Sequence, residues 1–193
     1  MEEIDVRTSF NVHDDLKHLS VPELRAENEK SRLPFAVCAW NVDGNLNIGM
    51  MIRSACNLGA ERFIVIGRRH YDKRSCVGSN HYLDLQIVNG YDFNRDLYDA
   101  EAFWNEMQKW GYTPVFLETF GNPVNTSFDL KRYTENGMKP CLVFGSESKG
   151  IPQEIVNDSR AEVVAIPQVG VIRSYNVSAA AAIAMWELVR STL

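Results

Sequence analysis

Short apolar runs alternate with amphipathic segments along most of this chain. Six runs have the composition of strands buried on both faces of a sheet; they cover residues 35–40, 62–67, 83–88, 113–118, 141–145 and 162–167, of which the third is the least apolar. Between these runs, apolar side chains recur at helical spacing and predict helices over about 48–58, 99–110, 152–158 and 177–191. Strands that alternate with helices predict the α/β class, with a parallel sheet that carries helices on both faces.

The first 33 residues differ from the rest, because large apolar side chains are rare among them. Ser20 and Glu23 have the spacing of a capping box, and Pro22 suits the first turn of a helix over about 22–31. We therefore expect residues 1–33 to form a helical or extended arm or a partner-contact element, and residues 34–193 to form one domain.

Composition narrows the class of protein. The chain is 45% hydrophobic and 23% charged, as in ordinary globular domains. It has no apolar run of transmembrane length and no signal-peptide pattern, so we expect a cytoplasmic protein without a membrane partner. The net charge of −5 argues against a surface dominated by polyanion binding, but a local basic patch is compatible with it. Cys38 and Cys141 lie in apolar runs, which predicts buried free thiols.

The first candidate for chemistry is the stretch from Asn47 to Arg53. Asn47 stands where a helix N-cap is expected, Gly49 allows close approach of another backbone, and Arg53 lies in the middle of the predicted helix. By pattern alone, a surface arginine beside a capped helix explains these residues equally well.

The second candidate is the loop that follows the strand at 141–145. It contains Gly145, Glu147 and Gly150 and leads through Pro152 into a helix. It is not a P-loop, because Lys-Ser/Thr does not follow the second glycine. A plain turn with an exposed Glu147 is the alternative, although loops at this edge of α/β sheets often bind ligands.

The third candidate runs from Ile166 to Trp186 and reads as a strand end, a polar loop and a helix. Ser174, Asn176 and Ser178 are concentrated in the loop, and four alanines, Ala179 to Ala182, begin a helix suited to close packing. The alternative is that Asn176 is an ordinary helix cap.

A basic stretch contains Arg68, Arg69, His70, Lys73 and Arg74. It is either a solvated loop or, with Tyr71, a surface for phosphate contact and base stacking. The four histidines are not at metal-ligand spacing, and no GxGxxG fingerprint occurs, so neither a zinc site nor a dinucleotide-binding domain is predicted.

Taken in order, the three candidate stretches resemble the motifs of the SpoU (TrmH-like) RNA ribose 2′-O-methyltransferases, a branch of the SPOUT superfamily. The resemblance covers about residues 34–193. It rests on a set of motif positions: Asn47, Gly49 and Arg53; Gly145, Glu147, Gly150 and Pro152; Ile166, Pro167, Ser174, Asn176 and Ser178. Gln168 and Tyr175 depart from the residues common in the family, but the polar positions are intact.

The resemblance implies a fold and a cofactor that periodicity does not suggest. It implies a deep C-terminal trefoil knot, a homodimer with the knots at its interface, and S-adenosylmethionine held in the knot. The expected cofactor-binding residues are Leu117, Gly145, Ile166, Ser174, Asn176 and Ser178. Since a sulfonium already makes the methyl group electrophilic, no metal is expected.

The resemblance also implies roles in methyl transfer to RNA. Arg53 is expected to bind RNA phosphate and to stabilise the developing alkoxide, because a guanidinium is a poor base. Asn47 and Asn176 would orient the ribose or Arg53, Ser174 would support the substrate pocket, and Glu147 would hold its loop by a bond to Asn47 or Arg53. The residues expected to contact RNA are Arg53, Arg68, Arg69 and Arg173.

We expect the substrate to be tRNA rather than rRNA, because the chain is close to a bare catalytic core and Arg173 directly precedes Ser174. Two alternatives stay open: a non-catalytic RNA-binding or assembly factor on the same scaffold, and a knotted methyltransferase that acts on a base.

Overall fold

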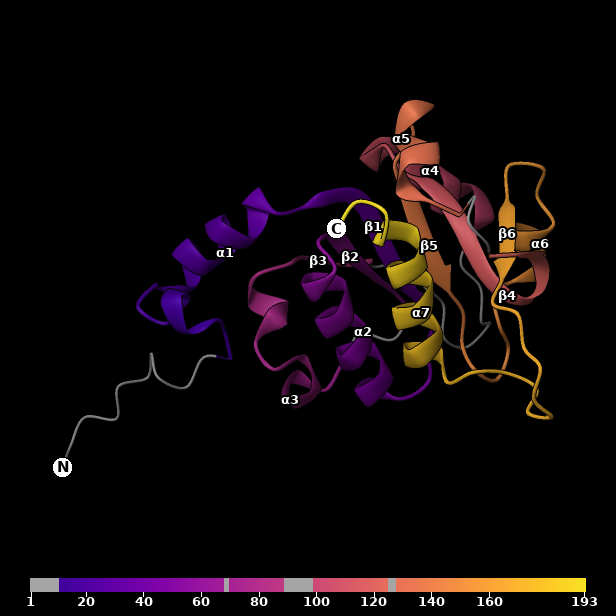
Figure 1. Ribbon diagram of the computed structural model, residues 1–193. Helices are drawn as coiled ribbons and strands as arrows, with labels where there is room; N and C mark the ends of the chain where they lie inside the picture. The colour runs from indigo at the N-terminus through magenta and orange to yellow at the C-terminus, as the bar shows by residue number, and fades with distance from the viewer. Residues whose placement is uncertain (1–10, 68–69, 89–98, 125–127) are drawn as a thin grey trace.

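A six-stranded parallel sheet forms the centre of the protein (Figure 1), in a computed structural model that describes residues 11–67, 70–88, 99–124 and 128–193. The strand order is β3-β2-β1-β5-β4-β6, and every neighbouring pair is parallel. The strands are β1 (Leu33–Trp40), β2 (Ala60–Ile66), β3 (Asp84–Val88), β4 (Thr113–Pro123), β5 (Pro140–Phe144) and β6 (Glu162–Ala165). The predicted α/β class and all six predicted strands are confirmed.

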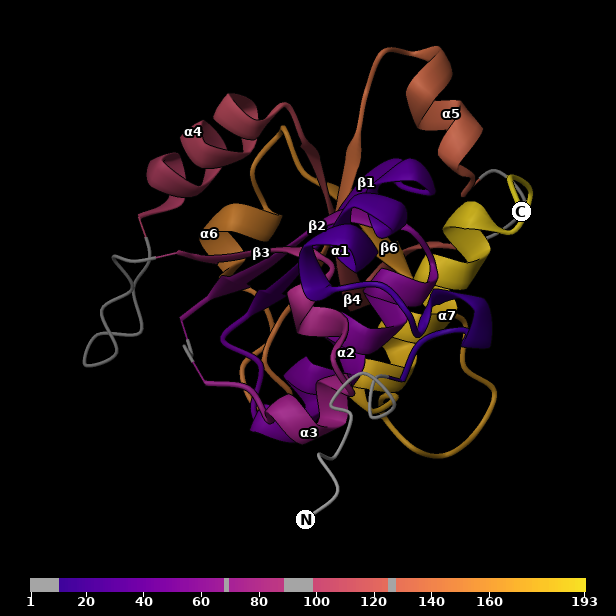
Figure 2. The ribbon, with the colours of Figure 1, turned by 90° about the vertical axis from the view of Figure 1, so that its left-hand side faces the viewer.

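Helices cover both faces of the sheet, as the alternation of elements predicts (Figure 2). They are α1 (Val21–Lys30), α2 (Asn45–Asn57), α3 (Lys73–Cys76), α4 (Ala100–Trp110), α5 (Leu130–Glu135), α6 (Gln153–Val156) and α7 (Val177–Val189), with short 3₁₀ turns η2 (Asp14–Leu16) and η3 (Ser79–His81). Helices α2, α5 and α7 pack on one face, and α4 and α6 pack on the other.

Strand β1 is apolar along its whole length because both of its faces are buried. Successive side chains of a strand point to opposite faces, so Val37 belongs to the core under α2 and α7, while Cys38 belongs to the core under α4. A central strand buried on both faces has no position for a polar side chain. Cys38 and Cys141 are fully buried and free, as predicted, and burial raises the pKa of both thiols.

Helices α3 and α5 were not predicted, and α6 is shorter than the helix predicted over 152–158. Helix α2 and strand β4 also differ from their predicted form. Helix α2 begins at Asn45, three residues before the predicted start, and Gly44, the residue before the helix, has a positive φ of 82°. Asn47 is therefore the third helical residue, and the prediction that it is the N-cap is wrong. Strand β4 continues to Pro123 instead of ending near residue 118, and its pairing with β6 is interrupted between Leu117 and Asn122.

The N-terminal arm docks on the domain through helix α1. The predicted capping box of Ser20 and Glu23 is present, and the side chains of Asn28 and Arg32 donate hydrogen bonds to the Tyr82 carbonyl at 3.3 and 3.2 Å. No helix in the described ranges is both long and apolar enough for a membrane span.

Candidate functional site

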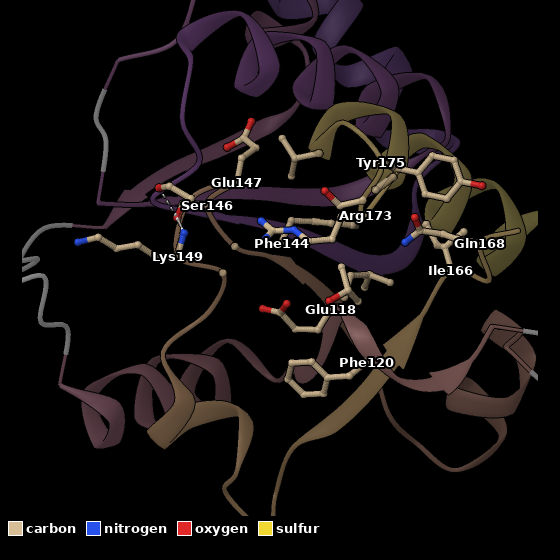
Figure 3. Close-up of a pocket in the computed structure, with 18 of the residues that line it drawn as sticks. Glu118, Phe120, Phe144, Ser146, Glu147, Lys149, Ile166, Gln168, Arg173 and Tyr175 are labelled. Atoms are coloured by element: carbon tan, nitrogen blue, oxygen red, sulfur yellow. Dashed lines mark hydrogen bonds between the residues drawn. The ribbon is translucent and has the colours of Figure 1, made fainter. Parts of the chain in front are cut away.

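A cavity of about 350 Å³ lies at the carboxyl ends of β4, β5 and β6 (Figure 3). Its wall includes Leu117, the last residue of β4 before its pairing becomes irregular, and Gly145 and Ile166, which directly follow β5 and β6. Ser174 and Arg173 line it from the segment before α7. The carboxyl edge of a parallel sheet is where α/β proteins bind ligands, and the volume is in the range of small-molecule sites. Four of the six predicted cofactor-binding residues therefore share one cavity.

A bulge in β4 brings further side chains to this cavity. Leu117 and Asn122 both pair with Val164 of β6, so residues 118–121 project out of the sheet. Glu118 and Phe120 line the cavity as a result (Figure 3). Sequence reasoning missed both, because the run 113–118 reads as a regular strand and only Gly121, at φ 135°, signals the irregularity.

The loop after β5 is closed tightly on itself. The Gly150 N–H donates to the Ser146 carbonyl at 2.8 Å, and Ser146 Oγ accepts from the Lys149 N–H at 3.0 Å. A side chain at Gly145 would meet the backbone of Gly150 at 2.4 Å, and Gly150 itself has a φ of 70°. Both motif glycines are therefore required by the backbone of the loop.

A chain of hydrogen bonds joins the three sequence motifs. Asn47 donates from Nδ2 to Glu147 Oε1 at 2.5 Å, and its Oδ1 accepts from Asn176 Nδ2 at 3.1 Å. Glu147 Oε2 accepts from the Asp43 N–H at 2.8 Å. The expected bond between Glu147 and Asn47 is thus present, and segments about 100 residues apart in sequence meet beside the cavity.

Asn176 also caps helix α7. Its Oδ1 accepts from the N–H groups of Ser178 and Ala179, at 3.0 and 3.3 Å, and from Ser178 Oγ at 2.6 Å. Asn176 and Ser178 do not line the cavity, in contrast to Ser174. Their contribution in this chain is to fix the start of α7 and the segment before it.

Gly49 and Arg53, the other two residues of the first motif, lie away from the cavity at the strand ends. Gly49 lets α2 approach α3, since a Cβ there would lie 2.6 Å from the Asp72 carbonyl oxygen. Arg53 is exposed two turns along α2 and lines a second cavity, of about 800 Å³, between α2 and the N-terminal arm. A single chain therefore does not place Arg53 in the cavity at the strand ends.

The residues expected to contact RNA are not gathered in one described patch. Arg173 lines the cavity, Arg53 lies elsewhere, and Arg68 and Arg69 fall outside the described residues. In the rest of the basic stretch, Arg74 forms an ion pair with Asp72 at 2.9 Å. In the ranges that the structure covers, no group of three or more His, Cys, Asp or Glu side chains is arranged to hold a metal ion.

The fold and the cavity define an α/β protein with a candidate ligand site at the carboxyl edge of a parallel sheet, beside which hydrogen bonds connect three segments that are distant in sequence. Comparison with known protein families shows which family within this class the chain belongs to. The chain belongs to the SpoU rRNA Methylase family, whose pattern matches residues 34–186. The resemblance inferred from the three motifs is thereby confirmed.

Solved structures share the fold, and a curated relative is similar in sequence over part of the chain. The A. aeolicus TrmH/SpoU tRNA modifying enzyme superposes with a TM-score of 0.65 at 23% identity, covering 86% of this chain and 79% of that one. The SpoU methyltransferase AviRb from Streptomyces viridochromogenes, solved with its cofactor AdoMet, gives 0.61 at 25% identity, with 83% and 62% covered. A Bacillus subtilis (strain 168) protein with the provisional name tRNA (cytidine(34)-2′-O)-methyltransferase is 33% identical over 75 residues, which are 39% of this chain and 45% of that protein. The chain spans less than two thirds of the length of the first curated relatives that it matches.

Proposed function

We propose that this protein transfers a methyl group from S-adenosylmethionine to a ribose 2′-hydroxyl of RNA. The observation that carries the proposal is the hydrogen-bonded chain of Glu147, Asn47 and Asn176, because it assembles the polar residues of all three family motifs beside one cavity.

The cavity suits S-adenosylmethionine in shape and in chemistry. Leu117, Phe144 and Ile166 offer apolar walls for a base, while backbone groups at the strand ends and Ser174 offer hydrogen-bonding partners. The cofactor supplies a methyl group made electrophilic by a sulfonium, and no residue of this chain is asked to hold a metal. Arg173 is placed at the cavity wall to attract the phosphate of an incoming RNA strand.

The protein acts as a homodimer in this proposal. Leu46, Met50 and Arg53 follow one exposed stripe of α2, and Ile183 and Trp186 are exposed on α7, which packs beside it (Figure 1). Exposed apolar side chains gathered on two adjacent helices favour burial against a second copy. Arg53 shares this stripe and does not line its own chain's cavity. In the dimer, Arg53 of one copy would therefore reach RNA at the cavity of the other copy.

The proposal has four finer features. The substrate is tRNA, in line with the tRNA activities in the names of relatives. The segment 166–176, which returns from edge strand β6 to α7 beside α2, completes a trefoil knot. Residues 1–33 are an arm outside the matched domain, and the protein works in the cytoplasm.

Nucleoside analysis of cells without the gene tests this function. Digested tRNA and rRNA from the deletion strain are compared with the parent by mass spectrometry, and the deletion strain is complemented with the wild-type gene. We expect one 2′-O-methylated nucleoside in tRNA to disappear and to return on complementation. Unchanged ribose methylation in both RNA classes would refute the proposed function.

A further inference from the structure

Glu118 is a cavity residue outside the three motifs. It follows Leu117 at the start of the β4 bulge, and its side chain points into the same cavity as Arg173 and Phe120 (Figure 3). Bulges beside binding sites re-aim side chains that a regular strand would direct elsewhere. The irregularity of β4 thus places a carboxylate at the carboxyl edge of the sheet.

One oxygen of Glu118 holds the loop that closes the cavity. Oε1 accepts a hydrogen bond from the Ile151 N–H at 2.8 Å. A Cβ on Gly150 would lie 2.9 Å from the same oxygen, so the loop backbone passes directly against the carboxylate. This contact fixes the end of the loop opposite Glu147, whose side chain anchors the loop to α2 through Asn47.

The other oxygen of Glu118 is available to a ligand. Within the described ranges, the donor to this carboxylate is the Ile151 N–H, and no Lys, Arg or His side chain forms an ion pair with it. A carboxylate has about four acceptor positions, so Oε2 can accept hydrogen bonds from a bound molecule without losing the loop contact.

The order of residues along β4 indicates which part of the cofactor meets Glu118. Leu117 belongs to the apolar wall suited to adenine, and Glu118 is the next residue out of the sheet. The ribose is bonded directly to adenine, whereas the amino-acid end lies beyond the ribose and the sulfur. A carboxylate is a good acceptor for a ribose diol, as in dinucleotide sites.

Resting on the proposed function, we propose that Glu118 is a cofactor-binding residue whose Oε2 accepts hydrogen bonds from the ribose hydroxyls of S-adenosylmethionine, while Oε1 positions the loop through Ile151. Nothing in the motifs assigns this role. It makes Glu118 a determinant of selectivity for ribonucleoside over deoxyribonucleoside ligands.

Calorimetry with two ligands tests the proposal without catalysis. The ligands are S-adenosylhomocysteine and its 2′,3′-dideoxy analogue, and the proteins are wild type, Glu118→Gln, Glu118→Ala and Glu154→Gln. Glu118→Gln keeps an oxygen for the Ile151 N–H, so it separates the ligand contact from the loop contact. Glu154 is an exposed carboxylate of the neighbouring helix α6 and provides the matched control.

We expect wild type and Glu154→Gln to bind the diol ligand about ten- to a hundredfold more tightly than the dideoxy analogue, the usual range for a bond to a charged group. Both Glu118 variants should reduce this ratio below about threefold. A Glu118→Gln protein that keeps the wild-type ratio overturns the proposal while leaving the proposed function intact. Absence of any binding of S-adenosylhomocysteine to wild type would overturn both.

Discussion

Single residues beside the cavity satisfy one another's hydrogen bonds. Asn47 uses its amide nitrogen for Glu147 and for the Asp43 carbonyl, and its oxygen for Asn176. Glu147 uses both of its oxygens as acceptors. Each donor in this chain of hydrogen bonds therefore faces an acceptor. Exchanging a carboxylate for an amide of nearly the same shape breaks one of the bonds.

Replacing Glu147 with Gln tests this chain. The new amide nitrogen faces a donor, either Asn47 Nδ2 or the Asp43 N–H, so one of the two loop contacts is lost. We expect kcat/KM for methyl transfer to fall by about tenfold or more, as for loss of a charge-assisted bond. Glu135→Gln, at an exposed site on α5, is the control and should act as wild type. Equal activity in the two variants would show that the chain does not matter.

The sequence could predict which residues belong to the site more readily than what each one does in the fold. The order and spacing of the motifs identified Gly145, Glu147 and Asn176 as a group. The prediction that Asn47 is the N-cap is wrong because α2 begins directly after Gly44. The positive φ of Gly44 cannot be recognised from the sequence, since a glycine allows several loop conformations.

At the scale of elements, apolar runs were sufficient for the strands but not for their irregularities. Burial on both faces forces a recognisable composition on β1 and β5, so their positions follow from the sequence. The bulge in β4 depends on which residues of β6 lie opposite, and this pairing is a tertiary property. Glu118 was missed for that reason, although it lies one residue from the predicted Leu117.

The exposed face of α2 and α7 carries a prediction of its own. Trp186 is 53% exposed and Met50 is 45% exposed, so Trp186→Glu should place a charge in the proposed dimer interface with little effect on the fold. We expect sedimentation to show a dimer for wild type and a monomer for this variant. Affinity for S-adenosylhomocysteine should change less than about threefold, whereas methyl transfer should fall strongly because Arg53 loses its partner site.

The control for this experiment is Gln108→Glu, at an exposed position of α4 on the other face of the sheet. It adds the same charge and should stay dimeric and active. A Trp186→Glu protein that sediments like the control, or a wild type that is monomeric at working concentrations, would contradict the proposed interface.

At the scale of the whole molecule, the parallel sheet follows from the alternation of elements, whereas the path of the C-terminus does not. Local pattern contains no information on which side of another loop a segment passes, so the knot came from the family resemblance and stays a prediction. The same holds for Arg53. Its position along α2 could be predicted, but the single chain places it beside the arm, away from the cavity.

Methyl transfer by the purified protein tests both the ribose target and the role of Arg53. Wild type, Arg53→Ala and the control Lys131→Ala, at an exposed lysine of α5, are incubated with unmodified tRNA and S-adenosylmethionine carrying a labelled methyl group, and the digested RNA is analysed by mass spectrometry. We expect a labelled 2′-O-methylnucleoside with wild type and Lys131→Ala. With Arg53→Ala we expect the rate to fall by at least about a hundredfold, because a group that stabilises developing charge is removed. The cofactor affinity of this variant should be unchanged. Label on a base, or full transfer by Arg53→Ala, would contradict these expectations.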